Sequence, residues 1–144
     1  MTVPICSTIC GDSPVGGAAV VYSATKISNA VPFAAPIIET TVPFDSVVFD
    51  VGPAITPDLP NLVINEDGFY EIIATQSWIG GSTDTMTIVV NDATVQTDSA
   101  ENPGLRAGSL SVLLELHTGD VVRLVAGSSD GDLLTATLSA EKRN

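Results

Sequence analysis

Few side chains of this 144-residue chain have the chemistry of a catalytic residue, and the single histidine is the first to consider. A Ser-His-Asp triad would have to use His117. This residue directly precedes a Thr-Gly-Asp turn, and no nucleophile-elbow motif accompanies it. We therefore interpret His117 as a polar strand end and predict that the protein is not an enzyme.

Acidic residues around a glycine form the second group with possible chemistry. Asp130 and Asp132 flank Gly131, and carboxylate oxygens are ligands that Ca²⁺ prefers. The chain lacks the EF-hand pattern, and Asp-Gly pairs belong primarily to turns. We therefore predict a turn here, keep Asp130 and Asp132 as weak calcium candidates, and expect no cofactor.

The two cysteines lie close together near the start of the chain. Cys6 and Cys10 are four residues apart, a spacing that is neither a CxxC redox motif nor half of a zinc ribbon. Free thiols, an internal disulfide and a bridge to another chain all stay open, with free thiols favoured in a reducing cytoplasm. Apolar neighbours suit this segment to docking on a partner: Val3, Pro4, Ile5 and Ile9.

Charge is scarce in this chain, and its balance is strongly acidic. Five Lys and Arg residues stand against 17 Asp and Glu residues, which gives a formal net charge of −12. This balance argues against nucleic-acid binding, which needs a basic face, and against docking on anionic lipid. Only 15% of the residues are charged, and because the cores of subunit contacts are depleted in charge, the shortage indicates an oligomer.

Neither a membrane span nor a secretion signal is visible in the sequence. No window approaches the ~20 apolar residues of a transmembrane helix. The first residues lack the basic start and the apolar core of a signal peptide. We therefore expect synthesis in a cytoplasm and no membrane insertion.

Short stretches of strand character alternate with turn signals through most of the chain, which predicts an all-β sandwich. Residues 1–17 show little periodicity and are predicted to be an arm, whereas residues 18–144 are predicted to form one domain. Strands are expected at 18–26, 45–52, 62–66, 69–80, 84–90, 93–98, 109–117, 121–126 and 133–141. An edge or irregular segment is expected at 28–41, and loops are expected at 53–61 and 101–108. We interpret 84–90 with 93–98, and 109–117 with 121–126, as β-hairpins.

Two of these strands carry apolar residues on both faces. By alternation, one face of 69–78 carries Tyr70, Ile72, Ala74 and Trp78. Its other face carries Phe69, Ile73 and Thr75. In 109–117, one face is fully apolar, and the other includes Leu113 among polar residues. A strand that is apolar on both faces is expected to be covered on both, and a neighbouring subunit is one possible cover.

Between residues 44 and 74, eight positions have the spacing of a known family signature, with no insertion or deletion between them. Four positions match that pattern outright: Phe44, Asp50, Gly68 and Tyr70. Four more carry apolar or small stand-ins: Ile55, Leu62, Ile72 and Ala74. The pattern resembles the signature of the complement-q globular head, and roughly residues 18–140 resemble the trimeric jelly rolls of the complement-q and tumour necrosis factor families.

This resemblance implies a two-sheet antiparallel jelly-roll sandwich of ten strands that assembles as a homotrimer. The first and last strands, with 69–78 and 109–117, would lie in the inner sheet and face the threefold axis. The implied candidates for trimer contacts are Tyr22, Tyr70, Trp78, Leu113 and Leu134.

From this resemblance, the lack of a visible signal peptide, the single domain with an arm, and the acidic composition, we expect a structural protein of a virus particle. It would be a bacteriophage capsid decoration (cement) or head-fibre protein at the capsid exterior. The arm would dock on the major capsid protein or another virion protein, and residues 18–144 would form an outward knob. Candidate anchor residues are Val3, Pro4, Ile5, Cys6, Ile9 and Cys10. The alternative is a host-adhesion tip of a tail fibre or bacterial surface filament, which binds a host surface glycan or protein.

Overall fold

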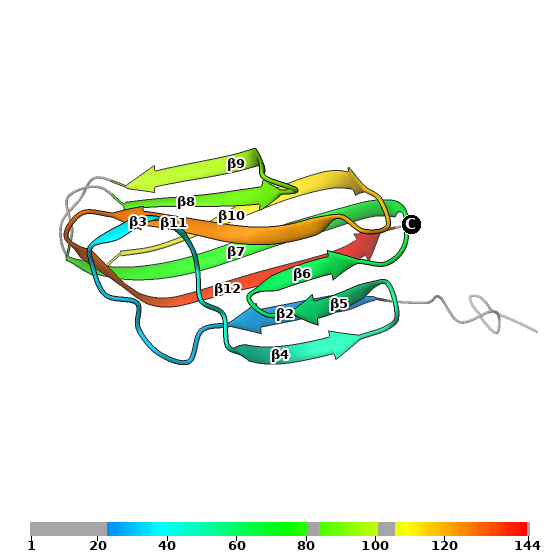
Figure 1. The fold of residues 1–144 in the computed structure, drawn as a ribbon, viewed down its shortest axis with the longest axis horizontal. Helices are drawn as coiled ribbons and strands as arrows, with labels where there is room; N and C mark the ends of the chain where they lie inside the picture. Colours follow the sequence, from blue (N-terminus) through cyan, green and yellow to red (C-terminus); the bar gives the residue numbers. More distant parts are fainter. Residues whose placement is uncertain (1–22, 81–83, 101–105, 144) are drawn as a thin grey trace, which may run out of the picture.

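The computed structural model describes residues 23–80, 84–100 and 106–143, and regular structure in these ranges consists of β-strands. Two antiparallel sheets pack face to face around one core (Figure 1). The predicted all-β, two-sheet antiparallel jelly roll is therefore confirmed. No helix in the described ranges is long and apolar enough to cross a membrane.

One sheet has five strands in the order β10-β7-β12-β2-β4. Its strands are β2 (Ala24–Ser28), β4 (Ser46–Val51), β7 (Gly68–Gly80), β10 (Arg106–Leu116) and β12 (Gly131–Arg143). The first and last predicted strands thus lie in one sheet with the two strands that carry apolar residues on both faces, as the family resemblance implies. β10 and β4 form the two edges of this sheet.

The other sheet has six strands, five of them in the order β5-β6-β11-β8-β9. Its strands are β5 (Ile55–Asp58), β6 (Asn61–Ile64), β8 (Asp84–Val90), β9 (Ala93–Ala100) and β11 (Val121–Ser128). The sixth strand, β3 (Ile37–Thr41), pairs only with the second half of β11. The predicted hairpin of 84–90 with 93–98 is confirmed, because β8 and β9 pair around Asn91 and Asp92.

The core lies between the sheets and is built from alternate residues of their strands. In β7 the even-numbered side chains point inward: Tyr70, Ile72, Ala74, Gln76 and Trp78 are all at most 8% exposed. The opposite sheet contributes Leu62, Ile88 and Leu124, each 0% exposed. Burying one such aliphatic side chain contributes roughly 1.5–3 kcal/mol, so this interior supplies the main stabilisation of the sandwich.

The predicted hairpin of 109–117 with 121–126 is wrong. β10 pairs with β7 in the five-stranded sheet, whereas β11 pairs with β6 and β8 in the other sheet. The turn between them is hydrogen-bonded to the six-stranded sheet. Gly119 N donates to Ile64 O at 2.7 Å, and Asn91 Nδ2 donates to Asp120 Oδ1 at 2.7 Å. A Gly-Asp turn therefore carries the chain from one sheet to the other.

Two predicted loops also need correction. The proline-rich stretch 53–61 contains strand β5, which lies at the edge of its sheet and pairs with β6 alone. An edge position tolerates Pro57 because one side of the strand has no ladder to complete. The loop predicted at 101–108 ends earlier, since β10 begins at Arg106. The predicted edge segment at 28–41 is regular only in β3.

The arm predicted at 1–17 and its boundary with the domain lie outside the described residues, as do Tyr22 and the first part of the predicted strand 18–26. β2 occupies the end of that predicted strand and continues to Ser28.

Candidate functional site

The face of the five-stranded sheet that points away from the core is the candidate functional surface, and we call it the open face. It carries the odd-numbered side chains of β7, together with those of β10 and β12 that stand beside them in register. Three large apolar side chains on it are strongly exposed: Leu113 is 62% exposed, Phe69 52% and Ile79 48%. Together they expose hydrophobic surface on the open face, as is typical of an interaction site.

Between these apolar side chains the open face carries short hydroxyl side chains. Thr75 stands between Ser109 and Thr137 in register, and the Thr75 and Thr137 hydroxyls are 2.5 Å apart. One row further, Thr135 Oγ1 donates to Ser77 Oγ at 3.1 Å. Because these side chains are short and uncharged, another protein surface can approach the sheet closely without desolvating an ion.

Charge on the open face is concentrated at one end, where Glu71, Glu115, Glu141 and Arg143 lie. Arg143 forms ion pairs with Glu71 and, at 2.9 Å, with Glu141. The hydrogen bond from Arg143 is the main cause that holds the pKa of Glu71 below its usual range. Leu113 lies directly opposite Glu71 in the β10–β7 register, so the most exposed apolar residue of the face borders this charged group.

Similar solved structures include murine APRIL, an Eiger TNF and a complement globular domain. Murine APRIL matches with a TM-score of 0.72 at 12% identity, over 85% of this chain and 99% of that one. Eiger TNF from S. frugiperda matches with a TM-score of 0.70 at 11% identity, over 87% and 94%. The globular domain of the zebrafish complement 1qA protein matches with a TM-score of 0.63 at 13% identity, over 81% and 94%.

This chain has the tumour necrosis factor and complement-q jelly-roll fold. The fold resemblance predicted from the sequence is confirmed by these structures. No protein-family model and no curated protein matches the sequence itself.

In this jelly roll, the predicted trimer-contact residues fall in different places. Leu113 lies on the open face, as expected of a contact residue. Tyr70 and Trp78 do not, because they have the opposite parity in β7 and are buried in the subunit's own core at 0% and 2% exposure. Their assignment as subunit contacts is corrected accordingly, and the exposed neighbours Phe69 and Ile79 take their place on the open face.

Leu134 occupies a special position in β12. The register with β7 shifts between Leu133 and Thr135, so Leu134 sits in a β-bulge and is half-buried. Asn29, a residue that the sequence did not single out, holds this bulge: Ala136 N donates to Asn29 Oδ1 at 2.5 Å, and Asn29 Nδ2 donates to Leu134 O at 3.4 Å. A single Asn between two strands gave no signal of this role.

The two weak calcium candidates lie at the turn that leads into β12 and at its start. Asp132 Oδ1 accepts a hydrogen bond from Ala35 N at 2.9 Å, and Asp130 Oδ1 accepts one from Ser129 Oγ at 3.2 Å. Within the described ranges, no group of three or more His, Cys, Asp or Glu residues is placed to hold a metal ion. Asp130 lies in the predicted turn, whereas Asp132 lies within β12 and is bonded to the distant Ala35, so only Asp130 fits the turn interpretation.

His117 lies at the exposed turn after β10. Its Nδ1 is 3.8 Å from Asp67 Oδ1, and both side chains are more than half exposed. Asp67 Oδ1 also accepts a hydrogen bond from Thr118 N at 2.8 Å, which is the main reason that its pKa is lowered. His117 therefore belongs to a polar turn at the end of the sandwich, which agrees with its interpretation as a polar strand end.

Proposed function

We propose that the protein is a non-enzymatic, homotrimeric binding module whose subunits meet through the open face. The observation that carries this proposal is the exposure of Leu113, Phe69 and Ile79 on a regular sheet whose remaining side chains are mostly short hydroxyls. Apolar surface removed from water contributes about 25 cal/mol per Å². A neighbouring subunit on this face would gain that contribution and would meet few charges.

A single substitution on the open face tests the subunit contact. Leu113→Glu places a carboxylate opposite Glu71 and in the same cross-strand row as Glu141, so association should bring unfavourable charge together. We expect light scattering to show a shift from trimer toward monomer. The matched control is Ile38→Glu, which changes an exposed isoleucine on the other sheet and should leave the trimer intact. A Leu113→Glu protein that remains fully trimeric would remove the open face as the contact.

Within this class we further propose a place on a virus particle, as a capsid decoration or head-fibre protein of a bacteriophage. This step is supported by sequence features: an N-terminal segment of different composition precedes the domain, and the chain is acidic with little total charge. In this proposal residues 1–17 bind the capsid, and the domain points outward from it.

Cosedimentation with purified virus particles tests this role. The full chain should sediment with the particles, and a chain without residues 1–17 should remain in the supernatant while keeping its trimeric mass. Equal sedimentation of both chains would contradict anchoring by residues 1–17. Saturable binding of the isolated trimer to host cells, without binding to capsids, would instead favour the host-adhesion tip.

A further inference from the structure

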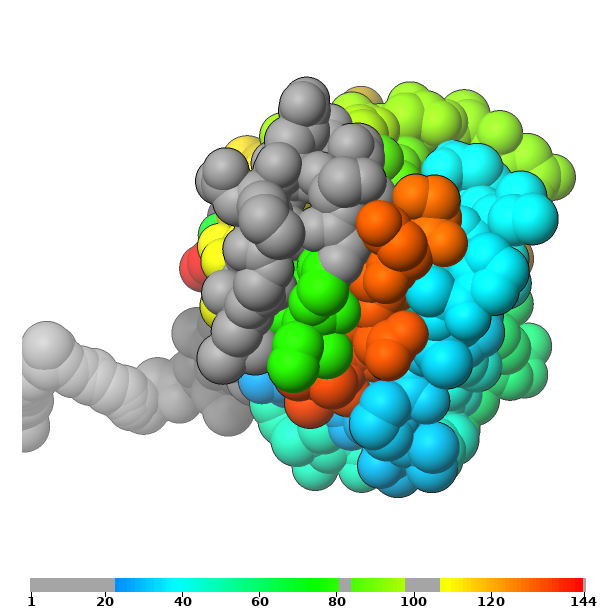
Figure 2. All heavy atoms as spheres, turned by 90° about the vertical axis from the view of Figure 1, so that its left-hand side faces the viewer, coloured from blue at the N-terminus to red at the C-terminus, as the bar shows by residue number. Residues whose placement is uncertain are grey.

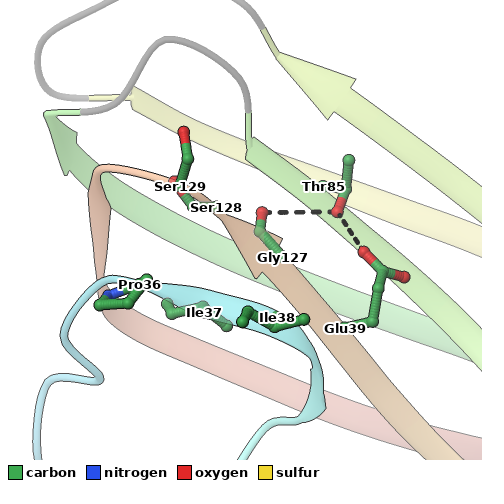
Figure 3. Close-up of a pocket in the computed structure, with 8 residues that line it drawn as sticks. All are labelled: Pro36, Ile37, Ile38, Glu39, Thr85, Gly127, Ser128 and Ser129. Carbon is green, nitrogen blue, oxygen red and sulfur yellow. Dashed lines mark hydrogen bonds between the residues drawn. The ribbon is translucent and has the colours of Figure 1, made fainter.

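A pocket of 490 Å³ lies on the outer face of the six-stranded sheet, where β3, β8 and β11 come together (Figure 3). Figure 2 views this end of the molecule and shows the segment of β3 in cyan beside the orange end of β11. Pro36 and Ile38 line one side, and Thr85 lines another. The volume falls within the roughly 300–1,000 Å³ of small-ligand sites.

The β3 side of the pocket is apolar and exposed. Ile38 is 80% exposed, more than any other large apolar side chain in the described part of the chain. Pro36 adjoins it on the same segment. This hydrocarbon surface would favour an aliphatic group laid against it.

A carboxylate from the same strand, that of Glu39, also lines the pocket. Glu39 has a φ of 35°, in the left-handed region that residues with a side chain seldom adopt. Its carboxylate points toward β8, where Thr85 Oγ1 donates to Glu39 Oε2 at 3.5 Å (Figure 3). No Lys or Arg of the described residues forms an ion pair with Glu39. A negative charge therefore stands beside the apolar wall, and the hydrogen bond that it receives from the described residues is the weak one from Thr85.

Gly127 makes room for this carboxylate. A Cβ at position 127 would stand 2.5 Å from Glu39 Oε2 and 2.8 Å from Thr85 Oγ1, so any larger residue would displace the carboxylate. The remaining polar groups of the pocket include the hydroxyls of Thr85 and Ser129, which can accept hydrogen bonds. The pocket thus combines an apolar wall, a negative charge and further acceptors.

This combination selects the chemistry of a ligand. An anion would be repelled by Glu39 and by a chain of net charge −12. A purely apolar ligand would desolvate the carboxylate without giving it a partner. Lysine and arginine side chains fit both halves, because their aliphatic stems lie along apolar surface while their heads form charge-assisted hydrogen bonds.

We propose that this pocket receives a lysine or arginine side chain of a partner protein, with the stem against Ile38 and Pro36 and the charged head on Glu39. The inference deepens the proposed binding function by giving the chemistry of its partner, and it rests on that function only in taking the partner to be a protein.

An NMR titration of the ¹⁵N-labelled full chain tests the pocket directly. The probes are Nα-acetyl-lysine methylamide and, as its uncharged match, Nα-acetyl-norleucine methylamide. We expect the lysine probe to shift the amide signals of Thr85, Gly127 and Ser129 at millimolar concentration, and the shifts to weaken as added salt screens the charge. The norleucine probe should produce much smaller shifts. No localised shift, or equal shifts with both probes, would overturn the proposal.

Two substitutions and a control complete the test. Glu39→Gln keeps the shape of the side chain and should raise the Kd for the lysine probe by about threefold to fivefold, as loss of one partly exposed ion pair does. Gly127→Ala should act in the same direction by displacing the carboxylate. Glu115→Gln, an exposed change on the other sheet, should leave the Kd unchanged. An unchanged Kd in Glu39→Gln, in a protein whose spectrum remains folded, would overturn the proposal.

The mass of the same samples separates this inference from the trimer proposal. A trimer that gives no response to the lysine probe contradicts the pocket alone. A monomer that binds the lysine probe at Thr85, Gly127 and Ser129 supports the pocket and contradicts the trimer.

Discussion

Tyr70 is the residue whose acid–base chemistry the fold changes most clearly. Its ring is 0% exposed, and its hydroxyl donates to Glu66 O at 2.6 Å. Burial is the main cause that raises the pKa of Tyr70 to about 12, with smaller contributions from Glu66 and Asp67. Because ionised tyrosine is disfavoured inside the fold, the hydroxyl acts as a structural hydrogen-bond donor at neutral pH.

A pH series on Tyr70→Phe tests this role. The folded-state pKa lies above the value of about 10 in the unfolded chain. The stability that the neutral Tyr70 hydroxyl gives the folded chain is therefore complete below about pH 10. It is lost as the pH rises through about 12. At neutral pH, we expect Tyr70→Phe to lower the free energy of unfolding by about 1 kcal/mol, since it removes one buried hydrogen bond. Urea titrations followed by the fluorescence of Trp78, the only tryptophan, measure both effects.

The comparison with wild type decides the outcome. Wild-type stability should fall between about pH 10 and 12 more steeply than that of Tyr70→Phe, so the two curves should converge and then cross. Parallel curves through this range would contradict a buried, neutral Tyr70.

Asn29 is the second residue on which local structure depends, because it satisfies the backbone where β12 bulges. Asn29→Ala would leave the buried Ala136 N without its acceptor. We expect a loss of about 1–3 kcal/mol in the free energy of unfolding, the cost of one unsatisfied buried donor. Gln96→Ala, which deletes an exposed amide in β9, is the control and should change stability little. Equal effects of the two substitutions would contradict this role of Asn29.

At the scale of the elements, alternation in β7 could be read from the sequence, but its assignment to faces could not be completed. The sequence correctly grouped Tyr70, Ile72, Ala74 and Trp78 on one side of the strand. It did not show which side faces the core, because Phe69 and Ile73 make the other side apolar as well. The family resemblance implies subunit contacts at Tyr70 and Trp78, but both residues line the interior.

The strand connections mark a second limit of prediction from the sequence. The turn at Gly119 and Asp120 has the composition of a hairpin turn, yet β10 and β11 belong to different sheets. A hairpin turn and a turn between two sheets can have the same residues. Only the long-range pairing of β10 with β7 and of β11 with β6 distinguishes them. Glu39 was missed for a related reason, since its place in a pocket depends on pairing of β3 with the distant strand β11.

Neighbouring positions in β7 offer a matched test of the two faces. Ile72 is 0% exposed in the core, so Ile72→Ala should lower the free energy of unfolding by about 2–5 kcal/mol. Ile73 lies on the open face, so Ile73→Ala should mainly weaken association and should show as dissociation on dilution. Thermal unfolding and light scattering of both variants measure these effects. Loss of association in Ile72→Ala alone would reverse the assignment of the faces.

At the scale of the whole molecule, the composition and the open face agree. Only 15% of the residues are charged, so few charged side chains are available to hydrate the surface. The five-stranded sheet accordingly presents exposed apolar side chains beside hydroxyls. The six-stranded sheet, by contrast, carries the pocket in which no Lys or Arg of the described residues pairs with Glu39. One sheet thus suits self-association, and the other suits a basic partner.

Removal of residues 1–17 tests whether residues 18–144 form the oligomer without the N-terminal segment. The open face is formed by β7, β10 and β12, all of which lie within residues 68–143. We therefore expect a chain of residues 18–144 to keep the oligomeric mass of the full chain in light scattering, with and without reductant. A monomeric truncated chain would show that assembly depends on the N-terminal residues instead.

The mass of the full wild-type chain in solution is the most direct test of the trimer. Light scattering over a dilution series should give three times the chain mass of 14.8 kDa. A mass of a single chain throughout the series would contradict the trimer and leave the apolar residues of the open face without a partner.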